Sequence, residues 1–316
     1  MASLYEGAVI ASLFDAAAVR LGRAQDGINR INTFPIPDGD SGTNMWFTWQ
    51  AAAQAAQGGA QTVGQAVKKA SRAALLAARG NSGIILSQIV AGLARRLGDL
   101  ETFTVRDFAE GLESGAEHAY RSVAEPVEGT ILTVMRAAAE AGRRASEQTA
   151  DLYRFLDHVV EAARDALART PDLLPRLRES GVVDAGGLGL LTILEAMRDD
   201  AEHGHEGSGE YSAAARGQSV ARGTRVEAPP MNLQARYGLE VQCLILGQAL
   251  DIPAMQRRLG EMGESLLVVG DETEVKVHVH TLMPQDVVDY LVTLGDLTQL
   301  TFENLDEQAK DFGARA

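Results

Sequence analysis

The chain has 316 residues, of which 46% are hydrophobic and 23% charged, a composition typical of a soluble globular protein of about two domains. The formal net charge of -14 argues against nucleic acid binding, although a bound metal ion can offset the field for an anionic ligand. The single cysteine, Cys243, excludes an internal disulfide and a cysteine-rich zinc module.

The N-terminus carries Glu6 and Asp15 and lacks the basic region of a signal peptide, and no apolar run reaches the roughly 20 residues needed to span a bilayer. We therefore expect a cytoplasmic protein.

Residues 1–201 are rich in Ala and Leu spaced with helical periodicity. Gly or Pro residues interrupt this pattern, for example in RGNSG (79–83) and EPVEGT (125–130). We expect eight helices, at about 6–30, 42–57, 62–79, 82–97, 104–122, 130–147, 151–168 and 186–201. Eight helices with little strand signal predict an all-α domain.

Residues 202–231 have no apolar periodicity and much Gly, Ser and Ala, which is typical of a linker. His203 and His205 lie in this segment, and solvated side chains explain them more simply than a metal site does.

The second domain, residues 232–316, changes to a strand pattern. Alternation with period two marks 239–246 and 274–282, and two further segments, 264–270 and 297–305, are also strand-like. Helical segments fall at about 252–261 and 284–294. The order β-α-β-β-α-β predicts a ferredoxin-like α+β domain.

The segment NTFPIPDGDSGTNM (32–45) holds two acids, Asp38 and Asp40, just before a predicted helix. Two carboxylates this close repel each other unless a cation lies between them, and Mg²⁺ typically binds one or two carboxylates together with substrate phosphates. A calcium loop starting at Asp38 is excluded, because Thr43 and Trp49 stand where Gly and Glu are required. The alternative is a Pro/Asp/Gly turn with a helix cap, which Ser41 or Thr43 can provide. In either case we expect the loop to face solvent.

The segment RGNSGIIL (79–86) is a second turn that opens a helix, and EPVEGTIL (125–132) and VVDAGGLG (182–189) are two more. Free N–H groups at such helix starts bind phosphate, although capping alone is an equal alternative for any one of them. Four such turns gathered at one end of a bundle would form a nucleotide-phosphate site. This domain shows no nucleophile arrangement, and His118 and His158 fit packing or surface positions.

Taken together, these four motifs resemble the nucleotide-binding domain of the dihydroxyacetone kinase L-subunit family. They resemble the catalytic subunit of bacterial fatty acid kinase more closely, and SLLVVGDETEVKVHVHT and GDLTQLTFENLDEQ resemble its middle domain. The resemblance covers nearly the whole chain except the linker. It implies an eight-helix antiparallel barrel that holds ATP or ADP and two Mg²⁺ ions at one end.

The resemblance also assigns residues. Asp38 and Asp40 match the metal-binding acids, and Asn32 falls near the third acid, where it offers at best an uncharged oxygen ligand. The nucleotide positions matched by these motifs are Ser41, Thr43, Asn44, Gly80, Asn81, Ser82, Gly83, Thr130, Asp184, Ala185 and Gly186.

The activity implied by the resemblance is transfer of the γ-phosphate of ATP to the carboxylate of a fatty acid, giving an acyl phosphate for phospholipid metabolism. The fatty acid is held by a separate carrier protein, which agrees with the absence of a nucleophile in this chain. Two alternatives stay open: a dihydroxyacetone kinase nucleotide subunit, and a nucleotide-binding regulatory or scaffold protein. The third, C-terminal domain of fatty acid kinase has no counterpart in this chain, and a homodimer is retained as one alternative for the oligomeric state.

The segment EVKVHVHTL (274–282) raises the question of a second metal. On a strand, His278 and His280 share one face with Lys276, and they can reach one ion or simply form a polar sheet face. The resemblance implies that these histidines bind zinc together with a cysteine, whose position is taken here by Gly238.

Cys243 is a poor substitute for that ligand, because it alternates in phase with Val241 and Ile245 on the apolar face. Glu240 shares the parity of Gly238 and could supply an oxygen ligand if the two strands are neighbours. We expect an altered, weakened zinc site or no metal at all.

Overall fold

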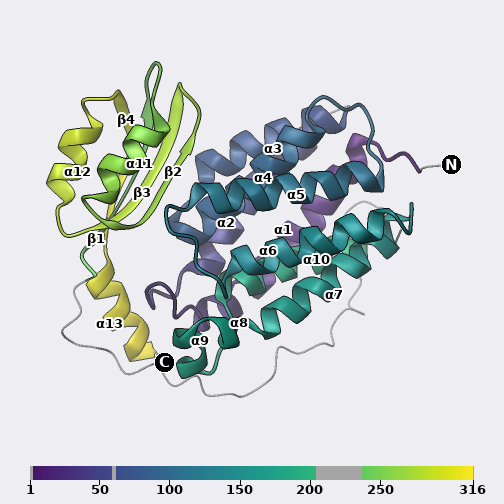
Figure 1. Cartoon of the computed structure of the whole chain (residues 1–316), viewed down its shortest axis with the longest axis horizontal. Helices are drawn as coiled ribbons and strands as arrows, with labels where there is room; N and C mark the ends of the chain where they lie inside the picture. Colours follow the sequence, from purple (N-terminus) through teal and green to yellow (C-terminus); the bar gives the residue numbers. More distant parts are fainter. Residues whose placement is uncertain (1–2, 59–61, 204–236, 316) are drawn as a thin grey trace.

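The computed structural model describes residues 3–58, 62–203 and 237–315. Apart from residues 202 and 203, the predicted linker, including His205, lies outside the described residues. Figure 1 shows a helical domain with a smaller domain of sheet and helices against one side of it. No helix within the described ranges is long and apolar enough to cross a membrane.

All eight helices predicted for the first part of the chain are present, and every end lies within two residues of its predicted position. They are α1 (Gly7–Arg30), α2 (Ser41–Gln57), α3 (Val63–Ala77), α4 (Gly80–Leu97), α5 (Val105–Ser122), α6 (Ile131–Ser146), α7 (Leu152–Ala168) and α10 (Ala185–Glu202). Each packs on the next and α10 packs back on α1, which closes the predicted antiparallel barrel. Two short helices, α8 (Thr170–Leu173) and α9 (Pro175–Ser180), were not predicted, because such short segments carry no measurable periodicity.

The barrel core combines alanines and larger aliphatic side chains with a few large rings. Phe14 and Trp49 join α1 to α2 with ring centroids 4.7 Å apart, and Phe108 meets Phe155 edge-on at 6.1 Å between α5 and α7. Because the helices run alternately up and down, the starts of α2, α4, α6 and α10 lie at the same end of the barrel.

The second domain has the predicted order of elements: β1 (Leu239–Leu246), α11 (Ile252–Gly260), β2 (Glu264–Gly270), β3 (Glu274–Thr281), α12 (Pro284–Leu291) and β4 (Asp296–Asn304). The sheet order is β2-β3-β1-β4 with every neighbouring pair antiparallel, which confirms the ferredoxin-like arrangement. Met255 and Leu259 of α11 and Val287 and Leu291 of α12 bury the apolar face of this sheet.

A further helix, α13 (Leu305–Arg315), follows β4 and corrects the expectation that the last element is a strand. Its start has a recognisable signal, since Asn304 Oδ1 accepts from the backbone N–H groups of Asp306 and Glu307.

The sheet domain is docked on the helical domain along β2. Leu267 and Val269 belong to the hydrophobic core cluster of the barrel, and Leu267 forms an antiparallel bridge with Val123 just after α5. The polar face of the sheet, which carries Gln242, turns toward the start of α4.

Candidate nucleotide and metal site

The carboxylate loop connects the end of α1 to the start of α2. Asn32 is 2% exposed; its Nδ2 donates to Asp38 Oδ1, and its Oδ1 accepts from Ser41 Oγ at 2.8 Å. Asn32, Asp38 and Ser41 thus converge from both ends of the loop.

The two acids are partly buried, which corrects the expectation of a solvent-facing loop. Burial and the neighbouring charge of Asp40 hold the pKa of Asp38 well above its usual range. Burial and the charge of Glu240 raise the pKa of Asp40 to about 6. Ile36 at the centre of the loop is 4% exposed and packs against Leu305 of α13, which explains the loss of solvent. Two acids held under these conditions favour a cation between them.

The expected capping by Ser41 or Thr43 is also wrong. The helix begins at Ser41, and the side chain of its N-cap residue Asp40 makes no capping hydrogen bond; Asn29 Oδ1 of α1 accepts from the Thr43 N–H at 3.1 Å instead. Thr43 instead faces α1, where its Oγ1 accepts from Gln25 Nε2 at 2.8 Å and from Asn29 Nδ2 at 2.9 Å. These bonds fasten α2 to α1 and leave the Thr43 hydroxyl occupied within the barrel.

The glycine turn at the start of α4 lies beside the carboxylate loop. Ser82 Oγ is 3.0 Å from Ser41 Oγ, so the two predicted segments meet. Gly83 packs on Asn44 and Thr48 of α2, because a Cβ at Gly83 would lie 2.7 Å from Thr48 Oγ1. The Gly80 N–H is already bound to Gln242 Oε1 at 3.0 Å, a contact that sequence reasoning missed.

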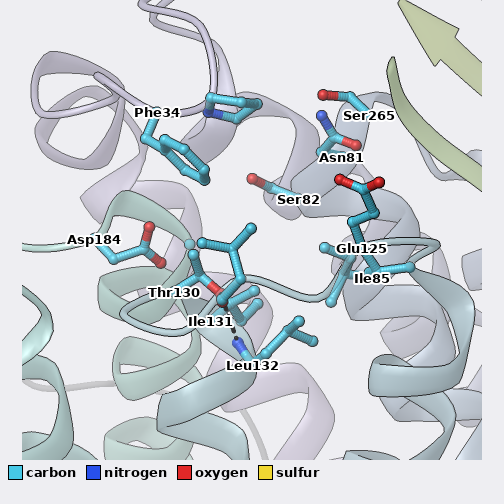
Figure 2. Close-up of a pocket in the computed structure, with 14 residues that line it drawn as sticks. Phe34, Asn81, Ser82, Ile85, Glu125, Thr130, Ile131, Leu132, Asp184 and Ser265 are labelled. Atoms are coloured by element: carbon cyan, nitrogen blue, oxygen red, sulfur yellow. Dashed lines mark hydrogen bonds between the residues drawn. The ribbon is translucent and has the colours of Figure 1, made fainter. Parts of the chain in front are cut away.

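A pocket lies between these helix starts, and Figure 2 shows its lining. Asn81 and Ser82 of α4, Thr130 before α6 and Asp184 before α10 line it, with Phe34 of the carboxylate loop at its edge. The rest of the wall is formed by apolar side chains, by Gly186, by Glu125 and by Ser265 of the sheet domain. Three of the four predicted helix starts therefore line one pocket, and the fourth, α2, meets it through Ser41 and Ser82.

The turn before α6 is fixed by a partly exposed polar network. Thr130 is 9% exposed; its Oγ1 donates to Val127 O at 2.8 Å and accepts from Leu132 N at 3.4 Å. Glu128 receives hydrogen bonds from Tyr120, Thr133 and, at 2.8 and 2.9 Å, from both terminal nitrogens of Arg136. The network holds Thr130 at the pocket wall.

Asp184 is the N-cap of α10 and accepts from the Gly187 N–H at 2.7 Å. Burial raises its pKa to about 7, although the N–H groups of Gly187 and Ile131 act in the opposite direction. Gly186 lines the pocket, whereas Ala185 is 3% exposed in the barrel core and does not.

The two histidines of β3 form a buried cluster with Glu240 of β1. Strands β1 and β3 are neighbours, with Glu240 opposite His280, as the zinc expectation required. The Nε2 atoms of His278 and His280 lie 3.1 Å apart, and Glu240 Oε1 lies 3.3 Å from His278 Nδ1. A tetrahedral zinc ion holds two imidazole nitrogens about 3.3 Å apart, so this spacing suits a shared ion. Burial and the charge of His278 lower the pKa of His280 to about 3, which keeps its ring neutral and able to bind a metal.

The structure agrees with the expectation that no cysteine completes this site. Cys243 is fully buried in the apolar core with Val241 and Ile245, and burial raises the pKa of its thiol to about 12. Gly238 has φ +76°, and a Cβ there would lie 2.4 Å from Thr281 O, so a cysteine would strain this backbone. Glu240 is the third member of the cluster.

Comparison with known proteins places both domains. Residues 35–199 match the family model described as the DAK2 domain, and residues 236–312 match the model of the FakA-like middle domain of fatty acid kinase. Uncharacterized proteins of Staphylococcus saprophyticus (34% identical) and Staphylococcus epidermidis strain RP62A (35%) each align with 98% of this chain, which covers 57% of their length. An uncharacterized protein of Staphylococcus aureus strain NCTC 8325 is 32% identical, and the chain covers 58% of it.

The chain thus spans little more than half the length of these curated relatives. A structural match, the dihydroxyacetone kinase of C. freundii, is 17% identical with a TM-score of 0.44, over 62% of this chain and 35% of that one. With its family model covering more than half of the sequence, the chain belongs to the DAK2 domain family, and it carries a middle domain of the FakA-like fatty acid kinase type.

Proposed function

We propose that this chain is the ATP- and Mg²⁺-dependent core of a kinase that phosphorylates the carboxylate of a fatty acid held by a separate carrier protein. The observation that carries the proposal is the position of two partly buried acids, Asp38 and Asp40, at the start of α2, which meets through Ser41 and Ser82 a pocket lined by three phosphate-competent helix starts. A cytoplasmic location, where ATP is available, is part of the same proposal.

The donor set at the carboxylate loop fits Mg²⁺. Asp38 and Asp40 supply carboxylate oxygens, and Asn32 lies in direct contact with Asp38. Their raised pKa values mean that the pair without a metal holds protons more tightly than ordinary carboxyls do, and a divalent ion can replace those protons. When bound, Mg²⁺ neutralises phosphate charge during phosphoryl transfer.

The remaining residues bind and orient the nucleotide. The N–H groups of Asn81 and Ser82 in the first turn of α4 are candidates to receive phosphate oxygens, with the helix dipole behind them, and Gly83 lets this turn pack closely on α2. Thr130 and Asp184 on the opposite wall would contact the rest of the nucleotide. The proposed acceptor is the carboxylate of the carried acid, so this chain needs to supply no nucleophile.

The acyl substrate and the carrier are supported by the type of middle domain. Glu240, His278 and His280 form a proposed zinc site in that domain, for which the buried, converging nitrogens and carboxylate are the support.

The test is acyl phosphate formation measured by mass spectrometry, with ATP, fatty acid and a candidate carrier from the same organism added or omitted. Product that requires both the carrier and Asp38 supports the proposal. Asp38→Asn should abolish turnover, whereas the exposed Asp26→Asn on α1 should leave it unchanged. Phosphorylation of dihydroxyacetone instead would identify the other kinase type, and nucleotide binding without turnover would indicate a regulatory protein.

A further inference from the structure

The start of α4 is held from the sheet domain by one side chain, Gln242 of β1. Its carboxamide is 5% exposed, and both ends are used: Oε1 accepts from Gly80 N at 3.0 Å, and Nε2 donates to Ala78 O at 3.3 Å. The two hydrogen bonds grip the backbone on both sides of Arg79, and they fix the turn whose next residues, Asn81 and Ser82, line the pocket.

Asn44 connects the turn held by Gln242 to the acids Asp38 and Asp40. A Cβ on Gly80 would lie 2.5 Å from Asn44 Nδ2, so the Asn44 amide packs directly on the backbone that Gln242 holds. A hydrogen bond from Asn44 to the Asp40 carboxylate lowers the pKa of Asp40 against the larger effect of burial. Gln242 is thus connected to the Asp40 carboxylate through two intermediate residues, Gly80 and Asn44.

A second contact from the sheet domain falls on the loop itself. Helix α13 turns one face toward the loop, where Leu305 and Ala309 bury Ile36. One turn further along, the ring of Phe312 covers Gly39, since a Cβ on Gly39 would lie 2.6 Å from the ring. Gly39 is the residue between the two acids, so Phe312 restrains the backbone that sets their separation.

We propose that Gln242 and Phe312 are positioning residues, through which the sheet domain sets the geometry of the metal acids. This inference rests on the proposed nucleotide function. Simple domain docking is already supplied elsewhere, by Leu267 and Val269 in the barrel core. The Gln242 and Phe312 contacts instead fall on the two segments that carry the phosphate and metal groups. Misplacing such groups by about 1 Å is enough to weaken a metal–phosphate site.

The experiment measures ADP binding by the full chain with a fluorescent nucleotide, with Mg²⁺ titrated and with Mg²⁺ withheld. Gln242→Met keeps the side-chain volume and removes both hydrogen bonds, and Phe312→Ala removes the ring over Gly39. The matched controls are Gln285→Met on α12 and Lys310→Ala on α13, both at exposed positions.

Each test variant should need a roughly tenfold higher Mg²⁺ concentration for half-maximal ADP binding. A change of this size is what the loss of one hydrogen bond to a charged group produces. The weaker Mg²⁺-free affinity should stay at the wild-type value in Phe312→Ala, whose contact falls on the metal loop alone, and should fall less than the Mg²⁺-supported affinity in Gln242→Met, which also loosens the α4 turn. Wild-type Mg²⁺ dependence in both variants would overturn the inference, and so would an equal loss of affinity with and without Mg²⁺, which indicates general damage to the fold. If the wild-type chain itself bound ADP without any help from Mg²⁺, the proposed function would fail instead.

Discussion

Replacing one metal acid should stabilise the metal-free protein while removing its function. Burial and the charge of Glu240 raise the pKa of Asp40 from an ordinary 3.8 to about 6. The ionised carboxylate is therefore less stable in the folded chain than in the unfolded chain. Asp40→Asn removes this charge and keeps a side-chain oxygen that can accept from Asn44.

The magnitude follows from the pKa. A rise from 3.8 to about 6 corresponds to about 3 kcal/mol, at 1.36 kcal/mol for each pH unit. The destabilisation caused by the ionised carboxylate is absent below the unfolded pKa. It grows as the pH rises from the unfolded to the folded pKa, and it is complete above the folded pKa. Asp40→Asn should therefore raise the free energy of unfolding by up to about 3 kcal/mol at pH 8, and by progressively less as the pH falls from 6 toward 4.

Urea denaturation in the presence of a chelator measures the effect. Both tryptophans of the chain, Trp46 and Trp49, lie on α2 directly after the loop, so their fluorescence reports the helical domain. Equal stability of wild type and variant at pH 8, or a gain that does not change between pH 8 and pH 5, would refute the reasoning. In the same preparation, Asp40→Asn should lose Mg²⁺-dependent nucleotide binding.

Gly92→Ala should destabilise the barrel by about 1–3 kcal/mol in the same assay, because its Cβ would lie 2.4 Å from the backbone of Gly115. The control Gly27→Ala, whose nearest neighbour is a flexible arginine tip at 3.8 Å, should instead be neutral or up to about 1 kcal/mol stabilising, and a similar loss in both would contradict the packing argument. Protein purified without an affinity tag should carry zinc that a chelator removes and that His280→Ala abolishes, whereas tightly held zinc that depends on Cys243 would show that the strand phase is wrong. Acyl phosphate should not form from free fatty acid without a carrier, and rapid formation by this chain alone would contradict the carrier requirement.

The sequence predicted those parts of the fold that depend on local patterns. The alanine-rich periodicity broken by Gly and Pro located all eight barrel helices, and period-two alternation located the four strands and the phase of Cys243. Strand parity also brought Glu240 to the histidine pair.

Contacts between the domains could not be predicted in this way. Gln242 and Gly80 are 162 residues apart, and nothing near either residue encodes the other. The same limit explains the error about the solvent-facing loop, because its cover is α13, a helix from the far end of the chain. Capping by Ser41 or Thr43 was predicted from residue type alone. In the structure the Thr43 hydroxyl is hydrogen-bonded to side chains of α1, and the Ser41 hydroxyl is hydrogen-bonded to Asn32.

The bridge between Leu267 and Val123 affects the solubility of the sheet domain. Strand β2 is at one edge of the sheet, and its outer side is paired with residues 123 and 124 of the helical domain, where Ala124 N donates to Leu266 O at 3.5 Å. The barrel thus covers an edge that would otherwise be free to pair with another chain. A sheet domain expressed without the barrel would expose this edge together with Leu267 and Val269, and strand-to-strand self-association is the expected result.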